Sequence, residues 1–230
     1  MKGVILTGGK GTRLRPFTYL VNKSILPVYD KPLIYFPIMS MINAGIEDII
    51  INAPSPEQIQ KVLSDENFKA DISYHLTKGN GVAAALLDMK RKIKHDPILT
   101  IFGDIYLTFG ITPPTDQDNC CIYVSTNVPD KLSEYGVAEL DSNNKVLSFE
   151  EKPKEPKGFH AHMGTTFFPA DIIDILESIE DVQGKHFTDV ANNYLAQGRL
   201  TADIHNKEWF NVGTYENMFL ATNYRRKLLN

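Results

Sequence analysis

Short apolar runs of strand length alternate with helical stretches through the first half of the chain. The pattern predicts strands at Val4–Leu6, Ile49–Ile51, Ile72–Leu76 and Ile98–Phe102. It predicts one helix at Leu33–Ala44, which Gly45 ends, a second that begins at Pro56 after Ser55, and a third at Val82–Ile93. Strands that alternate with helices are joined by right-handed crossovers, so we expect a largely parallel sheet here.

The alternation changes after about residue 118. Short strands are predicted at Cys121–Ser125, Val137–Leu140 and Val146–Glu150, and helices at Ile172–Ile179, Val190–Ala196 and Tyr215–Leu229. No linker divides the chain. We therefore expect a single α/β domain over residues 1–230, a Rossmann-like three-layer sandwich with a mostly parallel, mixed central sheet.

The composition is that of an ordinary globular protein. Of 230 residues, 43% are hydrophobic and 23% are charged. The longest apolar run, Val82–Leu87, is far shorter than the roughly 20 residues that span a bilayer. The first residues predict no secretory signal. The neighbours Cys120 and Cys121 match neither a disulfide nor a zinc site. We expect a cytoplasmic protein with no membrane partner.

The charge is unevenly distributed. The formal net charge is −4, which argues against general binding of nucleic acid. Residues 1–31 nevertheless carry a net +5, with six basic residues against the single acid Asp30, which leaves −9 for the other 199 residues. A basic, glycine-rich segment in an acidic chain favours a local site for a small anion. The alternative is a solvated basic surface.

The segment Gly8-Gly9-Lys10-Gly11-Thr12-Arg13-Leu14-Arg15-Pro16 directly follows the first strand. Glycines at a strand exit let backbone N–H groups approach phosphate oxygens, and arginine can bind phosphate through two parallel hydrogen bonds. Neither the Walker A pattern nor G-x-G-x-x-G fits these letters. The alternative to a phosphate loop is a plain surface turn.

Several segments together resemble the sugar-1-phosphate nucleotidyltransferases. The loop extended to Thr18 resembles the family's signature, and Lys23–Pro32 resembles its second motif. Further matches are Gly81-Val-Ala, Phe102-Gly-Asp104, Tyr135-Gly-Val137, Glu150-Glu-Lys-Pro153 and Trp209-Phe-Asn-Val-Gly-Thr214. The chain is most similar to the shorter glucose-1-phosphate thymidylyltransferases.

This resemblance implies the nucleotidyltransferase fold and a reaction between a nucleoside triphosphate and a sugar 1-phosphate that gives a nucleotide sugar and pyrophosphate. Residues 1–118 would bind the nucleotide and residues 119–230 the sugar. Mg²⁺ would be the cofactor, and a homodimer or homotetramer the assembly.

The resemblance also implies roles for single residues. The catalytic set would be Arg13, Lys23, Asp104 and Lys152. The nucleotide would be bound by Leu6, Gly8, Gly9, Gly11, Thr12, Arg13, Thr77, Gly81 and Asp104. The sugar would contact Gly136, Glu151, Lys152 and His162, and the metal would contact Asp104 and Asn211.

The chain departs from the family's pattern at three places. Asn211 stands where the family has a metal-binding aspartate, which removes a full charge, and Asp189 or Asp203 could compensate. Leu76-Thr77-Lys78 stands where the family usually has a base-reading glutamine. Neither Leu76 nor Thr77 can supply both a donor and an acceptor as an amide does, although the Thr77 hydroxyl can rotate between the two roles. His160-Ala161-His162-Met163 stands where the family often has a small apolar residue. The two histidines could bind a metal, lie on the surface or line the pocket, where His162 could contact a substituent that glucose lacks.

The sequence leaves three candidate functions open. The first is an active nucleotidyltransferase that uses dTTP or UTP. The second is a catalytically weak protein of the same fold that binds nucleotide or sugar phosphate, and the third is an active member that uses CTP, GTP or ATP with a modified sugar. A dinucleotide-dependent oxidoreductase is excluded by the loop pattern and by Val28, which stands where a ribose-binding acid is needed.

Overall fold

The computed structural model describes residues 1–128 and 131–230, which form two compact units. The first unit comprises residues 3–77, 101–111 and 208–230, and the second comprises residues 1–2, 78–100 and 112–207. Each unit therefore draws on separate stretches of the chain. A single domain with halves that meet near residue 118 stays a prediction.

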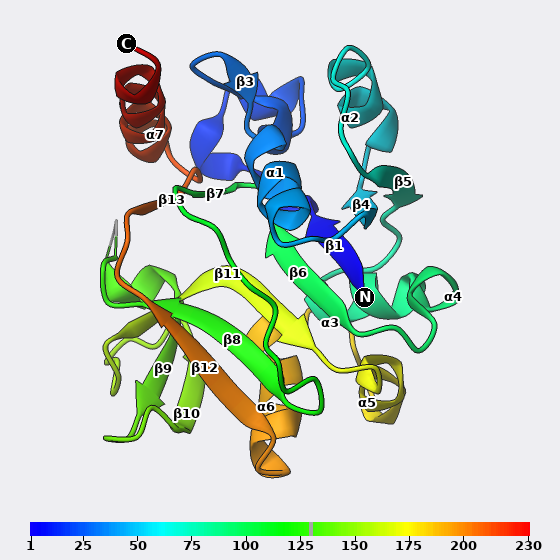
Figure 1. The fold of residues 1–230 in the computed structure, drawn as a ribbon, viewed down its shortest axis with the longest axis vertical. Helices are drawn as coiled ribbons and strands as arrows, with labels where there is room; N and C mark the ends of the chain where they lie inside the picture. Colours follow the sequence, from blue (N-terminus) through cyan, green and yellow to red (C-terminus); the bar gives the residue numbers. More distant parts are fainter. Residues whose placement is uncertain (129–130) are drawn as a thin grey trace. The chain divides into compact units, whose positions relative to one another are not determined.

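Three parallel strands form the sheet of the first unit. They are β1 (Lys2–Leu6), β4 (Asp48–Ala53) and β5 (Asp71–Leu76), with Val4 opposite Ile50 and Ile50 opposite Ser73. Ile49, Ile50 and Ile51 are all buried, as expected for a strand covered on both faces. The three strands predicted here are confirmed, with each extended by one or more residues (Figure 1).

The helices of this unit begin and end near the predicted residues. α1 spans Tyr35–Asn43, and Gly45 follows it in the left-handed region, with a φ of 78°, where its N–H donates to the Ile42 carbonyl. α2 spans Pro56–Val62 with proline in its first turn, although the Ser55 side chain forms no capping hydrogen bond.

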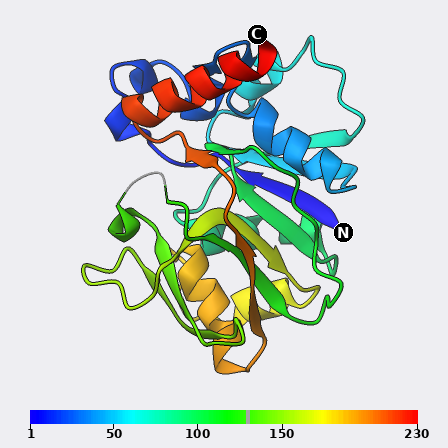
Figure 2. The same ribbon diagram turned by 60° about the vertical axis from the view of Figure 1, so that its left-hand side comes forward.

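Short strands and the last helix complete the first unit. β2 (Pro27–Val28) pairs with β3 (Lys31–Pro32), and β7 (Ile105–Leu107) pairs with β13 (Trp209–Asn211). α7 (Tyr215–Leu229) lies along the N-terminal segment (Figure 2), where Arg225 forms two hydrogen bonds with Asp30. Strands of two or three residues show no period, so the sequence did not predict them.

A ring cluster anchors β7 and β13 in this unit. Phe36 stacks on Tyr106 with 3.9 Å between ring centroids, and Phe210 and Tyr224 pack against Tyr106. Val28, Leu33, Val212 and Ala221 close the same buried cluster. The cluster therefore fixes the backbone that carries the residues on either side of Tyr106 and Phe210.

The second unit contains a mixed sheet of five strands in the order β10-β9-β11-β8-β12. They are β8 (Cys120–Ser125), β9 (Gly136–Leu140), β10 (Val146–Glu151), β11 (His160–Phe168) and β12 (Leu200–His205). Its helices are α3 (Val82–Asp88), α4 (Lys90–Ile93), α5 (Ile172–Ser178) and α6 (Phe187–Ala196). All pairs are antiparallel except β8 with β12.

The sequence outline needs correction in the second unit. The helix predicted at Val82–Ile93 is two helices, because Met89 leaves helical geometry with a ψ of 7°. β11 and β12 were not predicted. β11 lacks the alternation of apolar and polar residues that predicts a strand, because it buries polar residues such as Thr165 and Thr166 and contains Gly164 at a φ of 68°.

β6 (Ile98–Phe102) has the predicted bounds and passes from the second unit into the first. In the part of the chain that the structure describes, none of the helices has the length and apolar character needed to cross a membrane. A cytoplasmic location stays a prediction.

Candidate active site

The predicted phosphate loop is open at its tip. Gly8, Gly9 and Lys10 are exposed, and their backbone N–H groups donate to no group of the described residues. Gly11 turns the chain with a φ of 58°, and its carbonyl accepts hydrogen bonds from Thr18 Oγ1 at 2.7 Å and from the Leu14 N–H at 2.9 Å. Donors presented by a loop held at its far end suit a polyphosphate.

Lys23 lies beneath this loop. Its Nζ is 3.0 Å from the point that a Cβ on Gly9 would occupy, so only glycine fits there without a shift of the lysine. The Asn22 side chain caps the 3-10 turn that carries Lys23 by accepting a hydrogen bond from the Ser24 N–H. The ammonium is therefore held close to the loop backbone.

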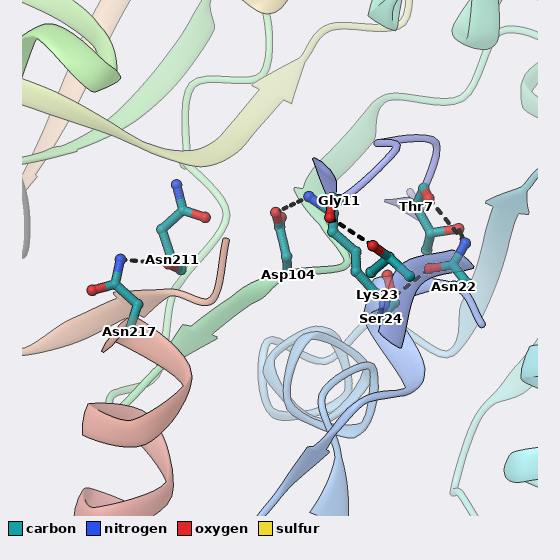
Figure 3. Close-up of polar contacts among 9 residues, drawn as sticks. Thr7, Gly11, Asn22, Lys23, Ser24, Asp104, Asn211 and Asn217 are labelled. Carbon is teal, nitrogen blue, oxygen red and sulfur yellow. Dashed lines mark hydrogen bonds and ion pairs between the residues drawn. The ribbon is translucent and has the colours of Figure 1, made fainter. Parts of the chain in front are cut away.

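Asp104 follows β6 and forms an ion pair with Lys23 (Figure 3). The lysine and aspartate side chains are only 16% and 11% exposed. Gly103 permits this geometry, because a Cβ there would lie 2.6 Å from Thr7 Cγ2 and 2.8 Å from Ser24 Oγ. Two predicted catalytic residues, 81 positions apart in sequence, thus meet directly.

Asn211 lies beside the strand that follows Asp104. It pairs with Ile105 across β13 and β7, and the Val212 N–H donates to the Asp104 carbonyl at 2.8 Å. Asn217 Nδ2 holds the Asn211 carbonyl at 3.0 Å (Figure 3).

The side chain of Asn211 shares its surroundings with Arg13. Arg13 Nη2 and Asn211 Oδ1 lie 3.2 and 3.5 Å from the position that a Cβ on Gly213 would take. The pair of Lys23 with Asp104 and the pair of Arg13 with Asn211 are therefore linked in the first unit through the backbone hydrogen bond from Val212 to Asp104, and together they form one cluster.

The side-chain oxygens of this cluster fit Mg²⁺, although they are few. Mg²⁺ prefers hard oxygen ligands and is commonly held by one or two carboxylates together with phosphate oxygens and water. Asp104 supplies one carboxylate and Asn211 one neutral amide oxygen. Over residues 1–128 and 131–230, no group of three or more His, Cys, Asp or Glu residues could hold a metal.

The two acids considered as compensation for Asn211 lie in the second unit. Asp189 accepts a hydrogen bond from the His186 N–H at 2.7 Å as part of the cap of α6. Asp203 lies 3.2 Å from His205. Each has a local partner there.

Two further residues predicted to contact the nucleotide lie at the ends of strands in the first unit. The Leu6 side chain is buried, and its carbonyl accepts a hydrogen bond from the Gly103 N–H. Thr77, directly after β5, donates through Oγ1 to Asn52 Oδ1 at 2.7 Å. Asn52 was missed in the sequence, where its only signal is a polar residue that follows the apolar run Ile49–Ile51. Thr12 is exposed in the 3-10 turn Thr12–Leu14.

Gly81 lies in the second unit and requires glycine. Its φ is 89°, and a Cβ would lie 2.8 Å from the Lys185 carbonyl oxygen. That carbonyl accepts hydrogen bonds from the N–H groups of Val82 and Ala83. The first two backbone N–H groups of α3 therefore already donate to a carbonyl of the protein.

Three predicted sugar residues meet at one end of β9 and β10. Gly136 pairs with Glu151, whose Oε2 accepts a hydrogen bond from Thr188 Oγ1 at 3.4 Å. Lys152 follows with a φ of 46°, and its N–H donates to the Tyr135 carbonyl at 3.0 Å. A left-handed lysine is strained, and such strain clusters at functional positions. These residues form a second candidate cluster.

His162 lies in the core instead of on a free surface. It is 7% exposed, and its Nε2 contacts the Thr165 carbonyl at 2.9 Å and Thr166 Oγ1 at 2.8 Å. Phe149 and Phe187 pack edge-on against the ring. Burial lowers the pKa of His162 to about 4, partly offset by the bond to Thr165. Nε2 is thus bonded within the protein, and a contact of His162 with the sugar stays a prediction.

Together, the parallel sheet, the open glycine loop and the cation–carboxylate cluster define an α/β protein suited to bind polyphosphate. The nucleotidyl transferase family matches residues 2–227. A glucose-1-phosphate thymidylyltransferase of Mycolicibacterium smegmatis is 34% identical over 99% of this chain and 83% of its own length. One from Neisseria meningitidis is 32% identical over 100% of this chain and 84% of its own. The chain belongs to the nucleotidyl transferase family.

Solved structures agree with the predicted fold class. A Bacillus anthracis structure in complex with sucrose, assigned to the glucose-1-phosphate thymidylyltransferases, has a TM-score of 0.91 at 30% identity over 98% of this chain and 95% of that one. A UDP-glucose pyrophosphorylase with bound UDP-glucose has a TM-score of 0.82 at 21% identity over 98% of each chain, which shows the fold alone. The α/β, Rossmann-like nucleotidyltransferase fold is confirmed. The homodimer or homotetramer stays a prediction.

Proposed function

We propose that this protein transfers a nucleotidyl group from a nucleoside triphosphate, dTTP or UTP, to a sugar 1-phosphate. The observation that carries the proposal is the ion pair of Lys23 with Asp104 directly beneath the open phosphate loop. The thymidylyltransferase relatives support a sugar 1-phosphate as the acceptor.

In the proposed reaction, an oxygen of the sugar phosphate attacks the α-phosphorus of the triphosphate. A new O–P bond forms as the bond between the α-phosphorus and the bridging oxygen breaks, and pyrophosphate leaves with that electron pair. The attacking oxygen is already an anion, so no general base is required. The residues must instead bring two anions together and spread the developing charge.

The first unit supplies the groups for the triphosphate. The amides of Gly8, Gly9 and Lys10 and the Arg13 guanidinium bind the phosphates that depart. Lys23 places a positive charge at the phosphate under attack, and its pairing with Asp104 fixes the direction of both side chains. Asp104 and Asn211 would hold Mg²⁺, which neutralises phosphate charge when bound.

The second unit supplies the groups for the sugar phosphate. Lys152 binds the phosphate of the sugar, with its backbone held by Tyr135. Glu151 accepts hydrogen bonds from sugar hydroxyls, and Thr188 orients its carboxylate. Gly136 lets Phe149 and Thr188 pack close to this backbone, because a Cβ there would lie 3.1 Å from the Phe149 ring and 3.2 Å from Thr188 Cγ2.

The test is a matrix of five nucleoside triphosphates against several sugar 1-phosphates with Mg²⁺, with release of pyrophosphate as the readout. Arg13→Ala should lower turnover by about 10²-fold or more, because it removes a donor to developing charge. The control is Arg91→Ala, which removes an exposed arginine from α4 and should leave turnover unchanged. A loss below about threefold for Arg13→Ala would remove this residue from the catalytic set.

Asn211 favours a second candidate, a nucleotide-binding protein of the same fold with weak catalysis. A neutral amide replaces the charge of a second carboxylate and so weakens attraction for a cation. Triphosphate binding without pyrophosphate release in any combination of the matrix would establish this second function.

A further inference from the structure

Asn22 links the phosphate loop to the turn that carries Lys23. Its Nδ2 donates to the Thr7 carbonyl at 3.1 Å, and its Oδ1 accepts a hydrogen bond from the Ser24 N–H at 2.9 Å (Figure 3). Thr7 directly precedes the glycines of the loop, whereas Ser24 directly follows Lys23. One partner is a backbone acceptor and the other a backbone donor, so only this orientation of the amide satisfies both. A single side chain therefore joins the two segments.

Both ends of this link are tied to regular elements of the first unit. Thr7 donates through its N–H and its Oγ1 to the Asn52 carbonyl, at 2.9 and 3.0 Å, which ties the start of the loop to β4. The Asn22 N–H donates to Gln58 Oε1 at 3.2 Å, which ties the turn to α2. The turn therefore cannot shift along the loop without breaking these hydrogen bonds.

The Lys23 side chain follows the loop from its first carbon to its ammonium. A Cβ on Gly11 would lie 3.3 Å from Lys23 Cβ, and a Cβ on Gly9 would lie 3.1 Å from Cε and 3.0 Å from Nζ. A lysine stem is flexible, so the place of its ammonium depends on where the backbone starts the side chain. Asp104 restrains the far end through the ion pair, and the turn held by Asn22 sets the near end.

Capping of the turn does not by itself account for an asparagine at this position. Serine, aspartate and asparagine cap helical turns about equally well, because each offers an oxygen to a free N–H group. Serine has only one oxygen for both tasks, and an ionised aspartate has no proton to donate. The asparagine amide can cap the turn through Oδ1 and still donate to Thr7 through Nδ2.

We propose that Asn22 is a positioning residue for nucleotidyl transfer: it sets the place of the Lys23 ammonium relative to the loop amides. The loop amides bind the phosphates that depart and Lys23 acts at the phosphate under attack, so the two must keep a fixed separation. A shift of about 1 Å in such a group can lower a rate by about 10²-fold. This inference rests on the proposed function, because it takes the loop as the site of the triphosphate.

The experiment is a double-mutant cycle on binding of inorganic tripolyphosphate without divalent cations, measured by titration calorimetry. In the wild type, Lys23→Met should weaken binding by about tenfold or more, because it removes a charge-assisted hydrogen bond. In Asn22→Ser, which keeps the cap and loses the donor to Thr7, Lys23→Met should weaken binding by about twofold or less. Should Lys23→Met not fold, Lys23→Gln replaces it in both backgrounds, because glutamine can still donate to Asp104.

Turnover provides a second readout. The kcat of Asn22→Ser and Asn22→Ala should fall by about tenfold or more, while the KM for the sugar 1-phosphate should stay within about twofold. The KM should persist because Glu151 and Lys152 lie in the second unit. A role confined to capping would instead leave the kcat of Asn22→Ser at the wild-type value.

The control is Asn192→Ala. It removes a hydrogen bond of the same kind, from Asn192 Nδ2 to the Phe149 carbonyl at 2.9 Å, in the second unit. This variant should lower stability and leave the contribution of Lys23 to tripolyphosphate binding unchanged. A smaller contribution of Lys23 in Asn192→Ala as well would assign the effect to general loss of stability and overturn the inference.

The outcomes separate the two proposals. If Lys23→Met leaves tripolyphosphate binding unchanged in the wild type, Lys23 and the loop are not the triphosphate site, and the proposed function is wrong together with the inference. If Lys23→Met weakens binding by the same factor in the wild type and in Asn22→Ser, or if Asn22→Ser keeps the wild-type kcat, the inference about Asn22 is wrong and the proposed function stands.

Discussion

The ion pair of Lys23 with Asp104 should be strongly coupled energetically, and a double-mutant cycle can measure that coupling. The chain offers a matched comparison in Lys90 and Glu177, whose charged atoms lie 3.0 Å apart. The variants are Lys23→Met, Asp104→Asn and their combination, beside Lys90→Met, Glu177→Gln and their combination. Both cycles remove the same charge types by near-isosteric changes.

Exposure sets the expected magnitudes. The Lys23 and Asp104 side chains are 16% and 11% exposed, whereas those of Lys90 and Glu177 are 52% and 50% exposed. Loss of one partner from a fully buried pair costs about 3–5 kcal/mol, and solvent-exposed pairs contribute about 0–1 kcal/mol. We expect a coupling energy of about 2 kcal/mol for Lys23 with Asp104. For Lys90 with Glu177 we expect about 0.5 kcal/mol or less.

Urea unfolding at low and high salt is the assay. The coupling of Lys23 with Asp104 should persist in about 0.5 M salt, because partly buried charges are screened little, while that of Lys90 with Glu177 should vanish. Equal coupling energies in the two cycles, or loss of the Lys23–Asp104 coupling in salt, would refute the reasoning. Asp104 would then not hold the Lys23 ammonium rigidly in the proposed catalytic site.

Two further predictions concern Asn211 and His162. Asn211→Asp restores a carboxylate beside Asp104, so Mg²⁺ affinity measured by titration calorimetry should rise by about tenfold or more; an unchanged or weaker affinity would show that Asn211 is not a metal ligand. Because burial lowers the pKa of His162 to about 4, the folded state keeps this ring neutral while the unfolded state takes up a proton near pH 6.5. Stability should therefore be fully present above pH 6.5 and decline toward pH 4, by about 2 kcal/mol between pH 7.5 and 5. Urea unfolding of His162→Gln should show a smaller decline, and an equal decline in both proteins would assign it to other groups.

Hydrophobic periodicity was sufficient for the elements that bury a continuous apolar face. The strand Ile98–Phe102, which buries its first four residues, has the bounds that the pattern predicts. The helix Tyr215–Leu229 also has the predicted bounds, although only Asn217 and Ala221 of it are buried. Periodicity failed where burial is polar or the element is short. β11 carries Thr165, Thr166 and His162 into the core, and β13 has only three residues. Their pairing depends on partner strands distant in sequence, which a local pattern does not contain.

The sequence by itself determined the chemical character of this protein: a glycine-rich loop after the first strand, with cations gathered in the first 31 residues. Local sequence suffices for this because glycine freedom and charge are properties of the residues themselves. Only the tertiary structure decided which groups meet. It joins Lys23 to Asp104, places Asn211 near Arg13 and Asn52 behind Thr77, and encloses His162 between aromatic rings. Each of these contacts joins residues on different strands or turns, so it exists only once the sheets have formed and the side chains have packed.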